Sequence, residues 1–217
     1  RSANTSSMTT RLIVSGTDTE VGKTVFCAGL ADALGADYWK PIQAGHEDGT
    51  DARRVAELGN LPPERILPER HILNTPASPH YAARLDGLTI DDHALLPPPP
   101  GARPLVIEGA GGLMVPVNDD TLFIDIFARW KLPLVLCART TLGTINHSLL
   151  SIEAVKRRGI PLLGIAFIGD EQAESERIIC KLGDVRRLGR LPHLAPLTHD
   201  SLCRAFAASF NLSDFAP

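Results

Sequence analysis

A glycine-rich loop between an apolar run and a helical segment constrains this chain more than any other feature. Residues 11–15 read RLIVS, a short β-branched run, and residues 16–24 read GTDTEVGKT. Glycine lets backbone N–H groups converge on phosphate oxygens, and the N-terminus of the following helix adds positive potential. Lys23 is placed to reach phosphate, and the hydroxyl of Thr24 is placed to bind Mg²⁺. The strand, loop and helix together predict a phosphate-binding P-loop.

The loop departs in two ways from the usual P-loop pattern, G-x4-G-K-[ST]. Gly16 and Gly22 are separated by five residues instead of four. Asp18 and Glu20 would repel phosphate unless they face a metal, water or a cationic substrate. A glycine turn that merely precedes Lys-Thr is the simpler alternative, but the strand before and the helix after the loop favour nucleotide binding.

Apolar runs and helical patterns alternate along the rest of the chain, which is typical of βα units. Continuous apolar strands indicate a sheet covered on both faces. The pattern predicts a three-layer α/β fold, P-loop NTPase-like, with a mostly parallel central sheet and helices on both faces. Prolines make residues 59–79 turn-rich and residues 97–100 a stiff surface connector. We expect strands at residues 11–15, 37–40, 104–108, 134–138, 160–168 and 185–191, and helices at 23–34, 51–58, 122–130, 146–158, 171–182 and 201–210.

Length and charge limit the classes of protein that remain. The 217 residues favour one domain, which we assign to residues 8–217; residues 1–7 precede Met8 and are interpreted as a remnant outside the natural chain. The net charge of −3 gives no basic footprint for nucleic acid or anionic lipid.

No apolar run reaches about 18 residues, so we expect no membrane partner. With no secretory signal in view, we expect a cytoplasmic protein whose four cysteines are buried free thiols. No Cys-X-X-Cys or paired-histidine spacing indicates zinc.

Two carboxylates are candidates for the metal that a P-loop needs. In a parallel sheet, ligands bind beyond the carboxyl ends of the strands, so one site should be shared by the loops after Ser15, Lys40, Glu108, Ala138 and Ile168. Glu108 ends a buried strand, where an unpartnered carboxylate would be costly, and corresponds to a Walker-B acid. Asp51 could reach the same ion, although an acid that favours the helix N-terminus explains it equally well.

Four motifs together carry a family resemblance. GTDTEVGKT (16–24), KPIQAG (40–45), EGAGG (108–112) and LGTINH (142–147), in this order and spacing, resemble dethiobiotin synthetase from about residue 11 to residue 194. The resemblance implies carboxylation and ring closure of 7,8-diaminopelargonic acid with CO₂, dependent on ATP and Mg²⁺. Dethiobiotin, ADP and phosphate would form through a carbamate and a carbamic-phosphoric anhydride.

The resemblance also implies roles for individual residues. Lys40 and Lys23 would be catalytic, and Thr24, Asp51 and Glu108 would bind magnesium. The implied nucleotide-binding residues are Thr19, Glu20, Val21, Gly22, Lys23, Thr24, Asp51, Glu108, Gly109, Ala110, Gly111, Gly169, Asp170, Pro192, His193 and Leu194. The implied substrate-binding residues are Thr19, Lys40, Ala44, Leu142, Gly143, Thr144 and Asn146.

In this family the segment at residues 142–146 belongs to the neighbouring subunit, so the resemblance implies a homodimer with the substrate site at the interface. The start of a helix there would bind the substrate's tail carboxylate. By itself the segment fits a simple capped helix equally well.

The chain departs from the family at three places. Ala44 stands where a serine is common, and Gly169 before Asp170 stands where an adenine-reading asparagine is common. Pro192-His193-Leu194 replaces the Pro-Trp-Leu of some members. The last two changes leave the base specificity open.

Two rival functions make different demands on the sequence. A partition-type P-loop ATPase, acting as a protein-binding switch, usually shows an apolar or basic surface for its partner; the net charge of −3 and the lack of a basic run argue against it. A cofactor-synthesis amidoligase would need an ammonia-generating domain, for which 217 residues leave no room.

Overall fold

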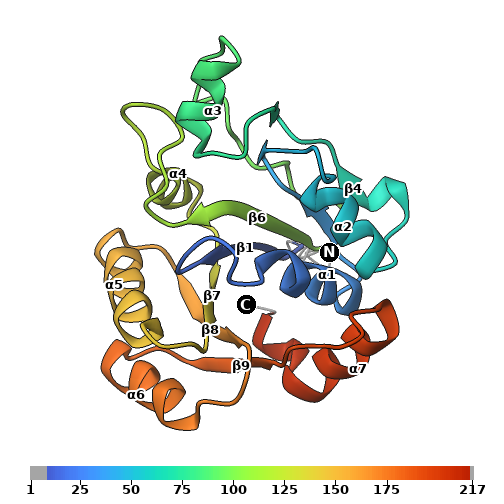
Figure 1. The fold of residues 1–217 in the computed structure, drawn as a ribbon, viewed down its shortest axis with the longest axis vertical. Helices are drawn as coiled ribbons and strands as arrows, with labels where there is room; N and C mark the ends of the chain where they lie inside the picture. Colours follow the sequence, from blue (N-terminus) through green and yellow to red (C-terminus); the bar gives the residue numbers. More distant parts are fainter. Residues whose placement is uncertain (1–8, 216–217) are drawn as a thin grey trace, which may run out of the picture.

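A seven-stranded parallel sheet forms the middle layer of the molecule (Figure 1). The computed structural model describes residues 9–215. Within them the strand order is β4-β2-β6-β1-β7-β8-β9, and each pairing between neighbours is parallel. The strands are β1 (Arg11–Gly16), β2 (Asp37–Trp39), β4 (Ile66–Leu67), β6 (Leu105–Gly112), β7 (Leu134–Arg139), β8 (Leu162–Ile168) and β9 (Arg187–Leu191).

Helices cover both faces of this sheet, as Figure 1 shows. One face packs against α1 (Lys23–Ala33), α2 (Asp51–Leu58) and α7 (His199–Ser209). The other packs against α4 (Phe123–Trp130), α5 (Thr144–Arg157) and α6 (Ala173–Gly183). A small parallel pair, β3 (Ile42–Ala44) and β5 (His71–Leu73), forms a second sheet near α3 (Pro79–Leu85). Two 3₁₀ turns lie at Pro63–Arg65 and Leu212–Phe215.

The two helical layers have separate cores because strand side chains alternate between faces. In β1, Leu12 and Val14 join the core under α1 and α7, whereas Ile13 joins the core under α4 and α5. All three are fully buried. A strand buried on both sides therefore reads as a continuous apolar run, and the predicted three-layer fold is confirmed.

The expected strands and helices are present, with shifted ends. The strand expected at residues 104–108 continues to Gly112, which pairs with Gly16 after a register shift. The helix expected from residue 146 begins at Thr144. Within the segment expected to be turn-rich, two- and three-residue strands form that are too short for a visible period-two pattern. Helix α3 was not expected because it starts at a proline, a residue that the first helical turn tolerates.

Other expectations have mixed outcomes. Cys27 and Cys137 are buried, but the expectation was wrong for Cys180 and Cys203, which lie on outer helices and are half-buried. Residues 97–100 form an irregular segment, as expected. The interpretation of residues 1–7 lies outside the described residues. No helix among residues 9–215 is both long and apolar enough to cross a membrane.

An aromatic cluster holds α7 onto α1. The rings of Phe206 and Phe210 stack with centroids 4.6 Å apart, and Phe26 of α1 lies against both. Phe206 is only 1% exposed. Because Phe206→Ala would leave a cavity here, we expect it to lower the free energy of unfolding by about 3–5 kcal/mol in urea denaturation. Tyr81→Ala is the control, since Tyr81 is 47% exposed. Equal losses in both variants would show that α7 packs differently.

Candidate active site

The loop from β1 to α1 has the conformation that a phosphate cradle needs. Gly22 precedes the helix with φ 93°, and no side chain caps the first turn. The first N–H groups of α1 therefore remain available to an anion. A side chain at Gly22 would be strained in this backbone, and its Cβ would lie 2.8 Å from Ile168 Cγ2. Lys23 Nζ donates to the main-chain oxygen of Asp18 at 3.0 Å, which places the ammonium within the loop.

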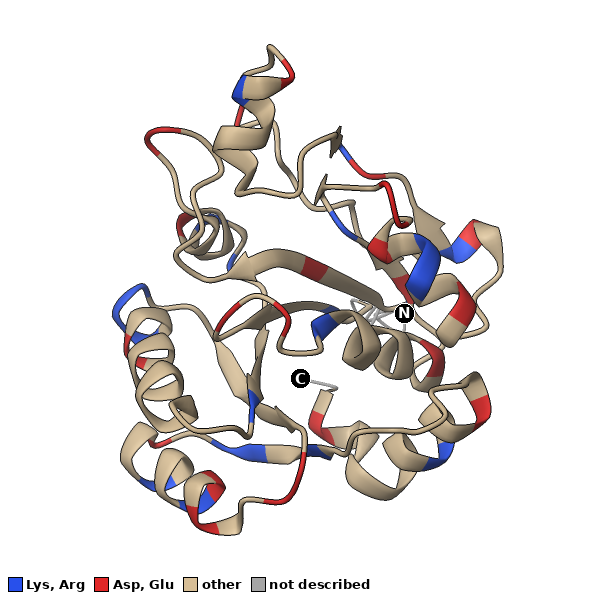
Figure 2. Cartoon of the chain, viewed as in Figure 1, with Lys and Arg blue, Asp and Glu red and all other residues tan. Residues whose placement is uncertain are grey.

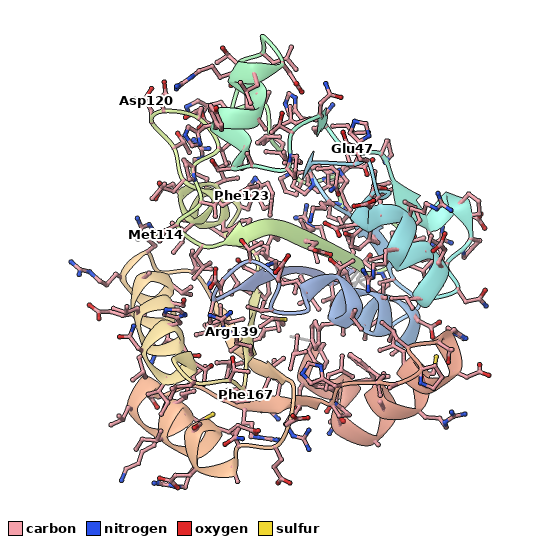
Figure 3. All side chains as sticks on the ribbon, in the orientation of Figure 1. Glu47, Met114, Asp120, Phe123, Arg139 and Phe167 are labelled. Atoms are coloured by element: carbon pink, nitrogen blue, oxygen red, sulfur yellow. The ribbon has the colours of Figure 1, made fainter. Side chains whose placement is uncertain are left out.

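The two acids of this loop have different surroundings. Asp18 Oδ2 accepts a hydrogen bond from Arg139 Nη2 at 3.3 Å, and its Oδ1 accepts one from the N–H of Thr19 at 2.8 Å. Arg139, labelled in Figure 3, ends β7 and compensates the charge of Asp18. Glu20 is exposed, has φ 58° and lines a cavity. The carboxylate of Glu20 is therefore available to whatever occupies that cavity.

Five side chains meet towards the carboxyl edge of the sheet, where β6 carries an acidic band midway along its length in Figure 2. Lys40 Nζ forms an ion pair with Asp51 and lies 3.3 Å from Glu108 Oε1. Thr24 Oγ1 lies 2.9 Å from Glu108 Oε1 and 3.2 Å from Asp51 Oδ1. Tyr38 OH donates to Glu108 Oε2 at 2.8 Å. Both oxygens of Glu108, only 1% exposed, are thus satisfied.

Burial and charge act in opposite directions on these groups. Burial alone would lower the pKa of Lys40, but Glu108 and Asp51 outweigh it and raise the pKa above the ordinary value. Burial likewise disfavours the charged form of Asp51, but Lys40 holds the pKa of that carboxyl below its ordinary value. Lys23 lacks such a close pair, and burial lowers its pKa. Lys40 is therefore held as a buried cation between two anions.

The donor set fits magnesium. The hydroxyl of Thr24 lies within hydrogen-bond distance of one carboxylate oxygen of Asp51 and one of Glu108, so the three groups offer oxygen ligands close together. Mg²⁺ prefers oxygen ligands and keeps several waters or phosphate oxygens in its octahedron. These three groups could therefore hold the ion beside a phosphate in the loop.

Two adjoining cavities open at this cluster. A cavity of about 410 Å³ is lined by the P-loop, including Lys23 and Thr24, and by Glu108. A second of about 430 Å³ extends towards β3 and α3, where Gln43, Ala44 and Pro79 line it. Both are lined by Thr19, Glu20, Lys40, Asp51 and Gly111. The arrangement provides space for two ligands on either side of Lys40.

Some of the predicted site residues lie elsewhere. Within residues 9–215, neither cavity is lined by Val21, Gly109 or the segment from Leu142 to Asn146. Val21 packs into the core under α1, and Gly109 packs against Phe127. The segment at residues 142–146 instead begins α5 at some distance along the sheet edge (Figure 1).

The residues predicted to surround the base lie beyond β8 and β9. Gly169 has φ 133°, and a Cβ there would lie 2.4 Å from Thr140 Oγ1 and 3.5 Å from His193 Nε2. This backbone does not accommodate the asparagine that is common in the family. Asp170 is exposed, and Pro192, His193 and Leu194 follow β9.

Three residues at the site were not singled out from the sequence. Tyr38 supports Glu108, and Arg139 compensates Asp18. Gln43 accepts a hydrogen bond from the N–H of Asp51 at 3.1 Å and so fixes the start of α2. Gln43 lies inside the KPIQAG motif, so a signal for it was present. Tyr38 lies in the middle of β2 and Arg139 ends β7, and only the sheet order brings them to the site.

The fold and the loop after β1 define a P-loop nucleotide-binding domain, and a family model described as "AAA domain" matches residues 10–201. The ATP-dependent dethiobiotin synthetase BioD of Afipia carboxidovorans is 79% identical over 208 residues, which cover 96% of this chain and 99% of that protein. The protein of the same name from Rhodopseudomonas palustris BisB18 is 66% identical, with the same coverage. The chain therefore belongs to the dethiobiotin synthetase family, and the predicted resemblance is confirmed.

Among solved structures, the septum site-determining protein MinD complexed with Mg-ADP from Pyrococcus horikoshii has a similar fold. Its TM-score is 0.50 at 15% identity, over 97% of this chain and 90% of that chain. This likeness concerns the fold alone.

The shifted pKa of Asp51 makes stability depend on pH. A carboxyl whose pKa is lower in the folded state than its ordinary 3.8 stabilises the fold above that value and loses this contribution as the pH falls through the folded pKa. In metal-free buffer, we expect the stability difference between wild type and Asp51→Asn to shrink as the pH falls below about 4. Urea denaturation across acidic pH measures it.

The control for this series is Asp119→Asn, which removes an exposed ion pair with Arg84 and should cost less than about 1 kcal/mol. If the difference in unfolding free energy between wild type and Asp51→Asn stayed constant down to the lowest pH, this would contradict the ion pair between Asp51 and Lys40.

Proposed function

We propose that this protein catalyses the ATP- and Mg²⁺-dependent ring closure of 7,8-diaminopelargonic acid with CO₂, giving dethiobiotin, ADP and phosphate. One observation carries the proposal: a P-loop cavity and a second cavity adjoin at Lys40. A ligase of this kind must hold ATP and the diamine with their reacting atoms in contact. Membership of the dethiobiotin synthetase family supports the same substrates, and we assign the reaction to the cytoplasm.

In this proposal the ATP phosphates bind in the P-loop cavity. The N–H groups at the start of α1 and Lys23 bind phosphate oxygens. Thr24, Asp51 and Glu108 would hold Mg²⁺, which when bound neutralises phosphate charge. Gly169, Asp170 and the segment at residues 192–194 flank the base. Thr140 and His193 lie close to Gly169, so their side chains would lie beside the base in this proposal.

The diamine would bind in the second cavity. Glu20 lines it with an exposed carboxylate, which attracts an ammonium group. Thr19, and Ala44 with its methyl group, line the same cavity. Lys40 lies between this cavity and the P-loop. The substrate amines would therefore face the γ-phosphate across Lys40.

The chemistry follows from this placement. One amine attacks CO₂ and loses a proton, which gives a carbamate. A carbamate oxygen then attacks the γ-phosphorus, and ADP leaves. The second amine attacks the carbamoyl carbon, phosphate leaves, and loss of a proton completes the cyclic urea. Each intermediate is an anion near another anion, so the protein's work is positioning and charge compensation by Lys40 and Lys23.

We further propose that the active unit is a homodimer in which α5 of the second copy binds the substrate's tail carboxylate. Leu142, just before α5, and Leu150, on α5, are 102% and 59% exposed. Met114, labelled beside it in Figure 3, is 54% exposed and borders a hollow that Leu150 also lines. Clustered exposed apolar side chains favour an interface.

Within the α5 segment, the residues differ in what they can offer. Thr144 Oγ1 donates to the main-chain oxygen of Arg139, and its N–H donates to Thr141. Asn146 is exposed in the first turn, so its amide and the neighbouring N–H groups are better placed for a carboxylate.

The alternative function, a partition-type ATPase switch, shares this fold. Such a protein would hydrolyse ATP without the diamine. The second cavity beside Lys40 and the 79% identity to a synthetase favour the ligase.

Replacement of the bridging lysine tests the proposal. We expect wild type to release phosphate from ATP only with the diamine and bicarbonate, in step with cyclic urea. Lys40→Met removes the buried cation and should lower kcat by about 100-fold or more, while ATP affinity changes little. Lys131→Met is the control, because Lys131 is an exposed lysine at the end of α4. Diamine-independent phosphate release would instead favour the switch.

Hybrid dimers test whether the site is shared. Lys40→Met and Asn146→Ala chains, co-expressed with different tags and purified through both, give hybrids with one complete site. If Asn146 acts on the partner's site, these hybrids should have about half of the wild-type activity, although both parent variants are poorly active. Hybrids no more active than the parents would place Asn146 outside the partner's site.

A further inference from the structure

A second group of ligating side chains lies between α1 and α7, which run side by side (Figure 1). Asp32 of α1 meets His199 and Cys203 of α7. Asp32 Oδ2 lies 3.2 Å from His199 Nε2 and 3.0 Å from Cys203 Sγ, and these last two atoms lie 3.1 Å apart. An oxygen, a nitrogen and a sulfur atom, all able to bind a metal, therefore lie within 3.2 Å of one another.

The spacing of His199 and Cys203 on α7 explains why these two side chains lie together. His199 and Cys203 are four residues apart, which places both side chains on one face of a helix. Asp32 completes the group from a position 167 residues away from His199. The usual zinc patterns in a sequence, Cys-X-X-Cys or paired histidines, do not include this combination.

The donor set is one that Zn²⁺ prefers. A thiolate, an imidazole and a carboxylate bind zinc at about 2.0–2.3 Å. In a tetrahedron these bond lengths separate the donor atoms by about 3.3–3.6 Å, a few tenths of an ångström more than the separations in this group. Small side-chain rotations would admit the ion.

The surroundings also suit a metal. Asp200 Oδ1 lies 3.5 Å from His199 Nδ1, the ring nitrogen that faces away from the group. A carboxylate in this position orients a ligating imidazole. The side chains of His199 and Asp32 are 34% and 32% exposed, so an ion can enter and a water can occupy the fourth position.

We propose that Asp32, His199 and Cys203 form a Zn²⁺ site that fastens α7 to α1. It is separate from the proposed Mg²⁺ site, because Asp32 lies eight residues after Thr24, or about 12 Å along the helix axis. The two sites also differ in chemistry, since one offers only oxygen and the other offers sulfur and nitrogen. Helix α1 begins at the phosphate loop, and the Zn²⁺ would stabilise it near its C-terminal end.

A nucleophilic Cys-His-Asp arrangement fits less well. In such a triad the acid orients the histidine through the nitrogen that does not face the nucleophile. Here Asp32 and Cys203 both contact Nε2. Burial and the hydrogen bond to Asp32 also raise the pKa of the Cys203 thiol to about 11, so it is not a thiolate at neutral pH without a metal.

Cobalt provides a direct test, because a thiolate bound to Co²⁺ gives a charge-transfer absorption that oxygen ligands do not. The purified full chain would be titrated with Co²⁺ in excess Mg²⁺ and a non-thiol reductant. We expect the band to saturate at one equivalent per chain and to be lost in Cys203→Ser. The matched control Cys180→Ser removes the other half-buried thiol and should retain it. Asp51→Asn, which alters the proposed Mg²⁺ site, should also retain it.

Zinc itself gives a second readout. Zn²⁺ should raise the melting temperature of wild type and of Cys180→Ser, and the shift should be lost in Cys203→Ser. His199→Asn should weaken Zn²⁺ binding about tenfold or more in competition with a chelating dye. Absence of the cobalt band in wild type, or its persistence in Cys203→Ser, would overturn the proposal. The three side chains would then be a hydrogen-bonded contact between helices.

Discussion

The ion pairs of Lys40 with Asp51 and Glu108 organise the candidate active site of this fold. A buried carboxylate without partners is too costly to keep charged, and Glu108 is buried in the central strand β6. Tyr38 in β2, Lys40 directly after β2 and Thr24 at the start of α1 satisfy it. The end of β2 and the start of α1 must therefore meet β6 at the same point of the sheet. The parallel order of β2, β6 and β1 is what brings them there.

The same network gives the site its proposed chemistry. A cation held between two anions keeps its charge in a buried environment, which is what a site for phosphoryl transfer to a carbamate requires. In the proposed function, Mg²⁺ would share the carboxylates of Asp51 and Glu108 with Lys40, and ATP and the diamine would be the substrates. The two cavities that adjoin at Lys40 give those substrates separate places.

Helix α1 connects the features of one face of the molecule. Its first turn is left without a side-chain cap where phosphate would bind. Its middle packs through Phe26 against the aromatic cluster of α7, and Asp32 near its end meets His199 and Cys203. These contacts along α1 fix its position, and so they fix the position of the N–H groups at its N-terminus. The opposite helical layer, with the exposed start of α5, is the side we propose for the second subunit.

The sequence by itself determined the fold class, the phosphate loop and the family. Strand periodicity and the GKT junction are local, and they need only a few neighbouring residues to be read. The motifs of the family contain Lys40 and Glu108, the resemblance also implied a role for Asp51, and the structure brings the three within contact distance. Only the tertiary structure decided what surrounds them. Tyr38 reaches Glu108 and Arg139 reaches Asp18 because the sheet order places β2 beside β6 and β7 beside β1, and Gly169 is confined because Thr140 lies against it. Asp32 meets Cys203 across 171 residues. Contacts of this kind depend on how strands and helices are ordered in space, and local sequence patterns do not predict that order.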